Sequence, residues 1–299
     1  MLTNFLNFYL SAKINNEQNL TAIQTPPSFE IVKFLTEKDF PPIKNHHFVS
    51  PLLESKAYLA IDFNSEIILE ENNSTEKRPV ASITKLMTLL IIIEENTLDQ
   101  VVTVSQNAAN TEGTNMKLLA NEKISLENLL YGTLIQSAND AATALAEHNA
   151  TSTEKFVEKM NLKAKQLGLE KTQFANPTGL DDNNNYSSAH DIAVLAKELY
   201  KHQFIQAAAI KQTLEVSSTD GSIKHQLTST NKLLGSYLKI KGLKTGTTEK
   251  AGLCLVTIAE NNQGNKIITV VLDSPDRFQE SKVLIDWIFK AYQWPTITP

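Results

Sequence analysis

Two side chains with complementary chemistry stand three positions apart in the first third of the chain. Ser82 offers a hydroxyl and Lys85 an amine, and residues 86–93 read LMTLLIII. A run that is apolar on nearly every side is typical of a buried helix, and positions i and i+3 of a helix share one face. We therefore expect the hydroxyl and the amine to lie within reach of each other at the start of a buried helix.

Such a pair could carry out nucleophilic catalysis. A serine hydroxyl is a weak nucleophile at neutral pH and needs a base beside it. A lysine can serve as that base where burial or a second cation disfavours its charged form. Taken alone, the spacing also fits a helix cap followed by a surface lysine, because serine and lysine three residues apart occur by chance in many chains.

Two further short motifs favour the catalytic interpretation over the helix-cap interpretation. Ser137-Ala138-Asn139 falls between two expected helices, and Lys244-Thr245-Gly246 falls at the head of an expected strand. Each motif is weak by itself. In this order and in these contexts, the three motifs together indicate one catalytic site built from Ser82-x-x-Lys85, Ser137-x-Asn139 and Lys244-Thr245-Gly246.

Composition excludes several other kinds of protein. The net charge of −5 argues against a nucleic-acid surface. Cys254 is the only cysteine, so an intrachain disulfide or a cysteine-rich metal site is excluded, and we expect it to be an inert buried thiol. His46-His47 is expected to be solvated. No apolar run is long enough to span a membrane, and the first ten residues lack the pattern of a signal peptide.

The order of the expected elements predicts an α/β (α+β) fold. An antiparallel sheet is built from both ends of the chain and flanked by helices, and a helical subdomain is inserted at about residues 98–205. Residues 1–50, with two Pro-Pro pairs, are expected to be an N-terminal extension, and residues 51–299 one catalytic domain. The expected strands are 57–62, 66–70, 101–104, 212–217, 222–228, 251–259 and 266–272. The expected helices start near Ser82, Ser125, Asp140, Thr151, Ser188 and Ser274.

With these motifs in place, the sequence resembles the serine D-alanyl-D-alanine carboxypeptidases, the low-molecular-mass penicillin-binding proteins related to serine β-lactamases. The likeness extends to Arg78-Pro79-Val80-Ala81, to the stretch 172–180 and to Tyr186–Asp191. It covers about residues 55–293. The resemblance implies the β-lactamase/transpeptidase-like fold, and the chain's end at Pro299 predicts a form with the catalytic domain only.

The resemblance also implies roles for four catalytic residues. Ser82 would attack the carbonyl of the penultimate D-alanine and release the terminal D-alanine from a peptidoglycan stem peptide. Lys85, held neutral, would accept the proton. Ser137 would pass a proton to the leaving amine, and Asn139 would hold the peptide amide. No cofactor or metal is implied.

Four residues of the third motif are implied to bind the substrate. Lys244 would bind the terminal carboxylate and depress the pKa of Lys85, and Thr245 would offer that carboxylate a hydroxyl. Gly246 would leave the strand edge open for the peptide, and the backbone N–H of Thr247 would join that of Ser82 in the oxyanion hole.

Three other functions remain open at this point. An endopeptidase that cuts D-alanyl cross-links would use the same residues. A β-lactamase needs fast deacylation, yet residues 176–186 contain aspartates and no glutamate. A non-catalytic cell-wall-binding protein would not need the complete set of motifs. The resemblance further implies β-lactam inhibitors as partners, action outside the cytoplasmic membrane, and membrane association only through a segment that is not visible in this chain.

Overall fold

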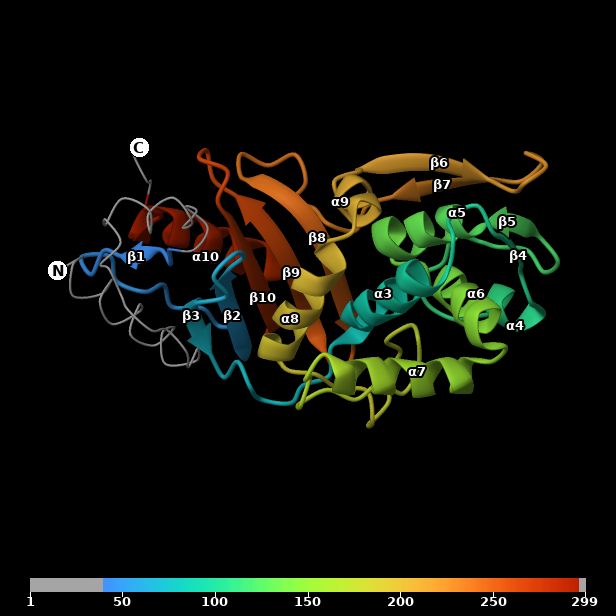
Figure 1. Ribbon diagram of the computed structural model, residues 1–299, viewed down its shortest axis with the longest axis horizontal. Coiled ribbons are helices and arrows are strands. Elements are labelled where there is room, and N and C mark those ends of the chain that lie inside the picture. Colours follow the sequence, from blue (N-terminus) through green and yellow to red (C-terminus); the bar gives the residue numbers. More distant parts are fainter. Residues whose placement is uncertain (1–39, 296–299) are drawn as a thin grey trace, which may run out of the picture. The chain divides into compact units, whose positions relative to one another are not determined.

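A five-stranded antiparallel sheet forms the centre of the protein. The structure, a computed structural model, describes residues 40–295. The strand order is β3-β2-β10-β9-β8, so the sheet combines strands from the two ends of the described chain (Figure 1). The strands are β2 (Ala57–Asp62), β3 (Ile68–Asn72), β8 (Lys239–Thr248), β9 (Gly252–Glu260) and β10 (Lys266–Ser274). This arrangement confirms the predicted fold class.

Helices cover both faces of the sheet, which explains why its central strands are apolar throughout. Alternate residues of β10 enter two separate clusters: Ile268 packs with α8 (Ala189–Tyr200), and Ile267 packs with α10 (Arg277–Ala291). A strand buried on both faces reads as a continuous apolar run rather than an alternating one. All six residues of β2 are accordingly buried.

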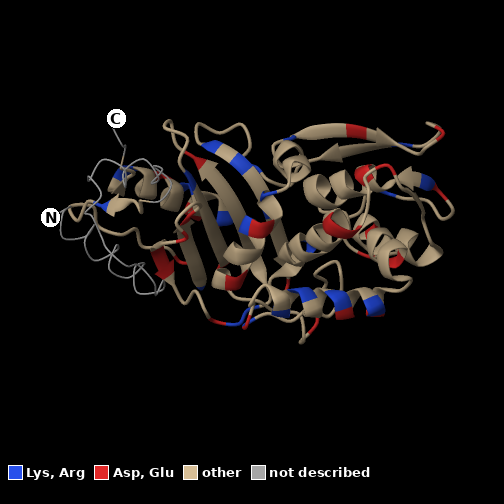
Figure 2. Ribbon diagram, viewed as in Figure 1, with Lys and Arg blue, Asp and Glu red and all other residues tan. Residues whose placement is uncertain are grey.

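A layer of helices lies beside the sheet and contains the second motif. Helix α3 begins at Lys85, and its residues 85–92 are all buried, as the apolar sequence predicts. Around it pack α4 (Gln106–Ala109), α5 (Leu126–Tyr131), the π-helix η3 (Gly132–Gln136), α6 (Asn139–Ala150) and α7 (Thr153–Gln166). The short strands β4 (Val101–Thr103) and β5 (Lys123–Ser125) pair at its edge. Lysines and glutamates alternate along α7 (Figure 2).

Two smaller pairs of strands complete the described fold. After α9 (Gln203–Ala209), strands β6 (Thr213–Ser217) and β7 (Lys224–Thr228) form a hairpin along the helical layer (Figure 1). Strand β1 (Ile43–Lys44) pairs with β11 (Tyr292–Gln293). The predicted extension 1–50 falls mostly on residues 1–39, which lie outside the described residues, so that boundary stays a prediction.

Several expected element boundaries are confirmed and others are wrong. Ser125 and Ser188 cap α5 and α8 as expected. Ser152, not Thr151, caps α7, because Thr151 adopts φ 66° at the end of α6. The last helix is capped by Asp276 rather than opened at Ser274. Helices α4 and α9 were not expected, because their short segments lack a clear apolar period.

Candidate active site

Ser82 and Lys85 meet as their spacing predicts. Ser82 lies in a single 3₁₀ turn, η2 (Ala81–Thr84), directly before α3. The Lys85 Nζ atom is 2.9 Å from the Ser82 Oγ atom. The same nitrogen donates to Asn139 Oδ1 at 2.6 Å and to the Thr178 carbonyl at 2.5 Å. One amine therefore contacts Ser82, the second motif and the loop that follows α7.

The surroundings of Lys85 disfavour its charged form. Its side chain is fully buried, and burial is the main cause that holds its pKa well below the usual value for lysine. The charge of Lys244 lowers this pKa further, while the buried Asp140 acts in the opposite direction. Burial and a second cation both disfavour protonation of Lys85, as a lysine base requires.

The second motif lies where η3 gives way to α6. Ser137 adopts a left-handed conformation with φ 64°, which turns the chain sharply into α6. Asn139 is held by the segment 112–114: its Nδ2 atom donates to the Glu112 carbonyl at 2.7 Å, and its backbone N–H donates to the Thr114 carbonyl at 2.6 Å. The Ser137 hydroxyl makes no hydrogen bond to another residue in the described part of the chain.

The third motif lies on β8, the edge strand of the sheet, against which the Ser82 turn packs. Lys244 lies within this strand rather than at its head, as the sequence had suggested. Its amine is buried and donates to the Thr245 carbonyl at 3.0 Å. Burial, followed by the charge of Arg277, lowers its pKa to about 7. Lys244 is therefore harder to protonate than an exposed lysine.

Arg277, in the first turn of α10, is a site residue that the sequence interpretation missed. Its Nη1 atom donates to the Gly246 carbonyl at 2.6 Å and to the Thr247 hydroxyl. The strand register explains its position, since Ser274 on β10 pairs with Leu253 and Leu253 pairs with Thr247. No local motif marks this residue, because only the combined register of β8, β9 and β10 places the start of α10 beside the third motif.

Two glycines hold the peptide that leads into Ser82. Ala81 has φ 49°, a left-handed value that is unfavourable for a residue with a side chain. A Cβ atom on Gly179 would lie 2.0 Å from the Ala81 carbonyl oxygen and 2.8 Å from the Ser82 nitrogen. A Cβ atom on Gly246 would lie 2.8 Å from the Val80 carbonyl oxygen. Close backbone contact from two sides therefore fixes the orientation of the Ser82 N–H group.

The structure thus brings together the residues of all three predicted motifs, and Thr178, Gly179 and Arg277 join them. Within residues 40–295, no group of three or more His, Cys, Asp or Glu side chains is placed to hold a metal ion. Cys254 is buried as expected, and burial raises the pKa of its thiol to about 11. The fold and the site define a protein in which a serine hydroxyl contacts a buried lysine amine, between an antiparallel sheet and a helical layer.

Comparison with known proteins gives the family. The model of the D-alanyl-D-alanine carboxypeptidase family matches residues 45–276, and the chain belongs to this family. It is 36% identical over 248 residues to the D-alanyl-D-alanine carboxypeptidase DacF of Bacillus subtilis, covering 80% of this chain and 63% of DacF. A D-alanyl-D-alanine endopeptidase of Haemophilus influenzae is 33% identical over 223 residues, covering 73% of this chain and 74% of that protein.

A solved structure agrees with this assignment. The Streptomyces K15 DD-transpeptidase superposes with a TM-score of 0.76 at 26% identity, covering 81% of this chain and 99% of that one. The chain spans somewhat less than two thirds of the length of DacF. None of the helices within residues 40–295 combines the length and apolar character that a membrane crossing requires.

Proposed function

We propose that the protein is a serine D,D-peptidase that removes the terminal D-alanine from peptidoglycan stem peptides through an acyl-enzyme on Ser82. The observation that carries this proposal is the contact between Ser82 and a fully buried Lys85. Membership of the D-alanyl-D-alanine carboxypeptidase family supports the choice of substrate. Because peptidoglycan lies outside the cytoplasmic membrane, the protein acts there.

The contacts of Lys85 support a role as the base. A neutral amine has two N–H groups and one lone pair. Asn139 Oδ1 and the Thr178 carbonyl accept those two N–H groups, which leaves the lone pair facing the Ser82 hydroxyl. Ser82 Oγ bonds to the carbonyl carbon of the penultimate D-alanine as its proton passes to Lys85. The peptide C–N bond then breaks, and Ser137 relays the proton to the leaving amine. Water later hydrolyses the ester.

Charged and hydrogen-bonding groups at the other side of Ser82 receive the substrate's terminal carboxylate. Arg277 provides a permanent cation there, and the hydroxyl of Thr245 provides a neutral donor. Lys244 adds a second cation for the carboxylate, and its charge also lowers the pKa of Lys85. The N–H groups of Ser82 and Thr247 form the oxyanion hole, and such donors act most strongly when they are fixed in advance.

One alternative has specific support. The Haemophilus influenzae relative that is named an endopeptidase matches over a larger share of its own length than DacF does. An endopeptidase would cut D-alanyl cross-links with the same Ser82 chemistry. The β-lactamase alternative has less support, because the loop 176–186 contains no glutamate to activate a water molecule. In that loop, Asp181 accepts a hydrogen bond from the Lys250 backbone at 3.3 Å.

Release of D-alanine tests the proposal. A peptide ending in D-Ala-D-Ala and a cross-linked peptide dimer are incubated with the wild type and with Ser82→Ala. Free D-alanine from the first substrate, absent with Ser82→Ala, supports the carboxypeptidase. Cleavage of the dimer alone favours the endopeptidase. A folded wild-type protein that binds the peptides and cleaves neither would contradict the proposal and favour a cell-wall-binding role.

A further inference from the structure

The β6–β7 hairpin and the loop after it link the second motif to the third motif. Beyond the end of β7, the Thr230 N–H donates to the Ile135 carbonyl at 3.1 Å, two residues before Ser137. The hydroxyl of the same residue is 2.6 Å from the hydroxyl of Thr245. One residue of the loop that follows the hairpin therefore bonds to η3, just before the second motif, and to the third motif.

A separate segment, residues 112–118, supports Asn139 from behind. The carbonyls of this segment hold both nitrogen atoms of Asn139, as described above. In return, the buried Asp140 carboxylate accepts the backbone N–H groups of Met116 and Leu118, each at 3.0 Å. The position of Asn139, and through it that of Lys85, thus depends on where this segment lies.

His225 joins the hairpin to this supporting segment. It lies on β7 and is 4% exposed. Its Nδ1 atom is 2.8 Å from the Met116 carbonyl oxygen, and its Nε2 atom is 2.7 Å from Glu122 Oε1. The Glu122 side chain is fully buried, and its other oxygen accepts the Leu119 N–H at 3.0 Å. None of these contacts involves Ser82, so the chemistry proposed for Ser82 does not explain them.

The contacts of the His225 ring use both of its nitrogen atoms. A carbonyl oxygen can only accept a hydrogen bond, so Nδ1 donates its proton to Met116. The ring's other nitrogen, Nε2, shares a buried hydrogen bond of 2.7 Å with Glu122 Oε1. Removing one partner of a buried hydrogen bond leaves the other partner buried and unsatisfied, which is destabilising.

We infer that the buried, hydrogen-bonded pair of His225 and Glu122 positions the second and third motifs relative to each other. The pair links the hairpin to the segment 112–118 behind Asn139. Thr230, in the loop after the hairpin, hydrogen-bonds to Thr245. Catalytic groups must be held within a fraction of an ångström, and a misplacement of about 1 Å can cost 10²-fold in rate. This inference rests on the proposed Ser82 acylation and adds two positioning residues to it.

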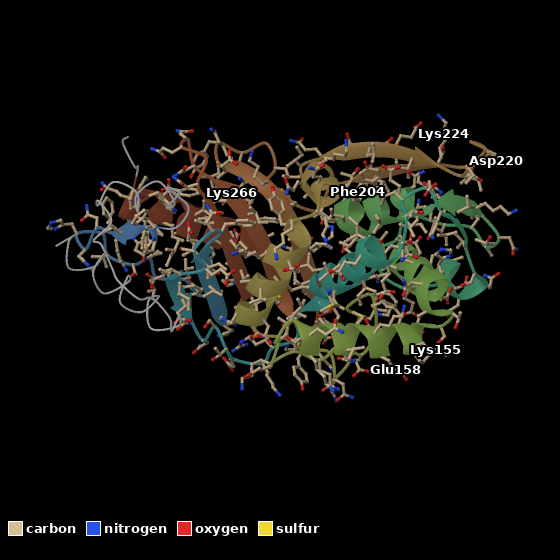
Figure 3. The ribbon with its side chains drawn as sticks, viewed as in Figure 1. Lys155, Glu158, Phe204, Asp220, Lys224 and Lys266 are labelled. Atoms are coloured by element: carbon tan, nitrogen blue, oxygen red, sulfur yellow. The ribbon has the colours of Figure 1, made fainter. Side chains whose placement is uncertain are left out.

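The test measures acylation of Ser82 by a β-lactam under pre-steady-state conditions, so that binding and the acylation step are obtained separately. His225→Gln is expected to slow the acylation step at least ten-fold, with a smaller change in binding. Glu122→Gln, which removes the charge and keeps the size, is expected to act in the same direction. The matched control is Glu215→Gln on the same hairpin, which breaks an exposed 2.8 Å ion pair with Lys224 and is expected to leave acylation and binding unchanged. Lys224 is labelled on this hairpin in Figure 3.

A second measurement keeps the inference falsifiable if a variant does not fold. NMR of the wild-type imidazole rings is expected to show one histidine whose Nδ1 proton is protected from exchange with solvent. Ile124→Val, a core change near Glu122 in sequence, controls for loss of stability alone. A His225 Nδ1 proton that exchanges as fast as that of an exposed histidine, or variants that acylate at the wild-type rate, would overturn the inference. Absence of acylation in the wild type would instead count against the proposed function.

Discussion

The reactivity proposed for Ser82 depends on the fraction of Lys85 that is uncharged. Burial alone lowers the pKa of this lysine, and Lys244 lowers it further although the two motifs are far apart in sequence. The neutral amine is the active form, so the acylation rate of the free enzyme rises with pH through the pKa of Lys85. The pH range over which the rate rises is the acidic limb of the pH profile. Its position therefore reports how strongly the neighbouring charges lower the pKa of Lys85.

Removing the charge of Lys244 should move the acidic limb. In Lys244→Gln the repulsion on protonated Lys85 is lost, so the pKa of Lys85 rises and the limb shifts to higher pH. Because the pKa of Lys244 is about 7, this charge is largest in the acidic part of the profile. The measurement is the rate of β-lactam acylation against pH. Lys239→Gln, at the exposed end of the same strand, is the control; a limb that stays in place or moves to lower pH would contradict the account.

The glycine beneath the nucleophile gives a second prediction at this scale. Gly179→Ala places a methyl group 2.0 Å from the Ala81 carbonyl, so the Ser82 N–H must move. We expect the acylation rate to fall by about 10²-fold or more. Gly264→Ala is a matched control, because Gly264 has φ 85° against 86° for Gly179 and open space around it. Equal losses in the two variants would show that backbone strain, rather than contact with the nucleophile's peptide, is responsible.

At the scale of elements, the sequence predicts most strongly where one pattern dominates. The apolar run after Lys85 could only be a buried helix, and Ser188 with Asp191 marks the start of α8 without ambiguity. Thr151 and Ser152 compete as neighbouring caps, and only the left-handed end of α6 decides between them. Arg277 was missed for a different reason, because its place beside Thr247 depends on the register of three strands rather than on any local motif.

We therefore expect Arg277, in the first turn of α10, to bind the substrate's terminal carboxylate. Arg277→Gln removes a charged hydrogen bond of about 1.5–3 kcal/mol, equivalent to about 10- to 100-fold in kcat/KM. The loss should be seen with a peptide that ends in a free carboxylate and should largely vanish when that terminus is amidated. Lys290→Gln, a cation at the other end of α10, is the control. The same loss with both peptides would contradict carboxylate binding by Arg277.

At the scale of the whole molecule, one apolar cluster runs from the helical layer into the sheet. It contains Met160 of α7, Leu90 of α3 and Ile268 of β10, all buried. The described residues, 40–295, belong to one compact unit. The site lies at the junction of sheet and helices, so its geometry requires that both layers remain folded together.

This continuity predicts cooperative unfolding. Met160→Ala should cost about 2–5 kcal/mol. The chain has two tryptophans, Trp287 and Trp294, and both pack in the separate cluster beneath α10. In Met160→Ala, the unfolding midpoint measured by tryptophan fluorescence should nevertheless fall by the same amount as the midpoint measured by helical circular dichroism. A fluorescence midpoint that stays at the wild-type value would mean that the helical layer unfolds on its own.

The most direct test of the central claim is intact-mass spectrometry after incubation with a β-lactam, on the wild type and on Ser82→Ala. The account predicts a persistent adduct with the mass of the β-lactam on the wild type and none on the variant. Rapid hydrolysis of the drug without a lasting adduct would indicate a β-lactamase instead. An adduct that persists in Ser82→Ala, or a folded wild type that neither retains nor hydrolyses the drug, would contradict Ser82 as the nucleophile.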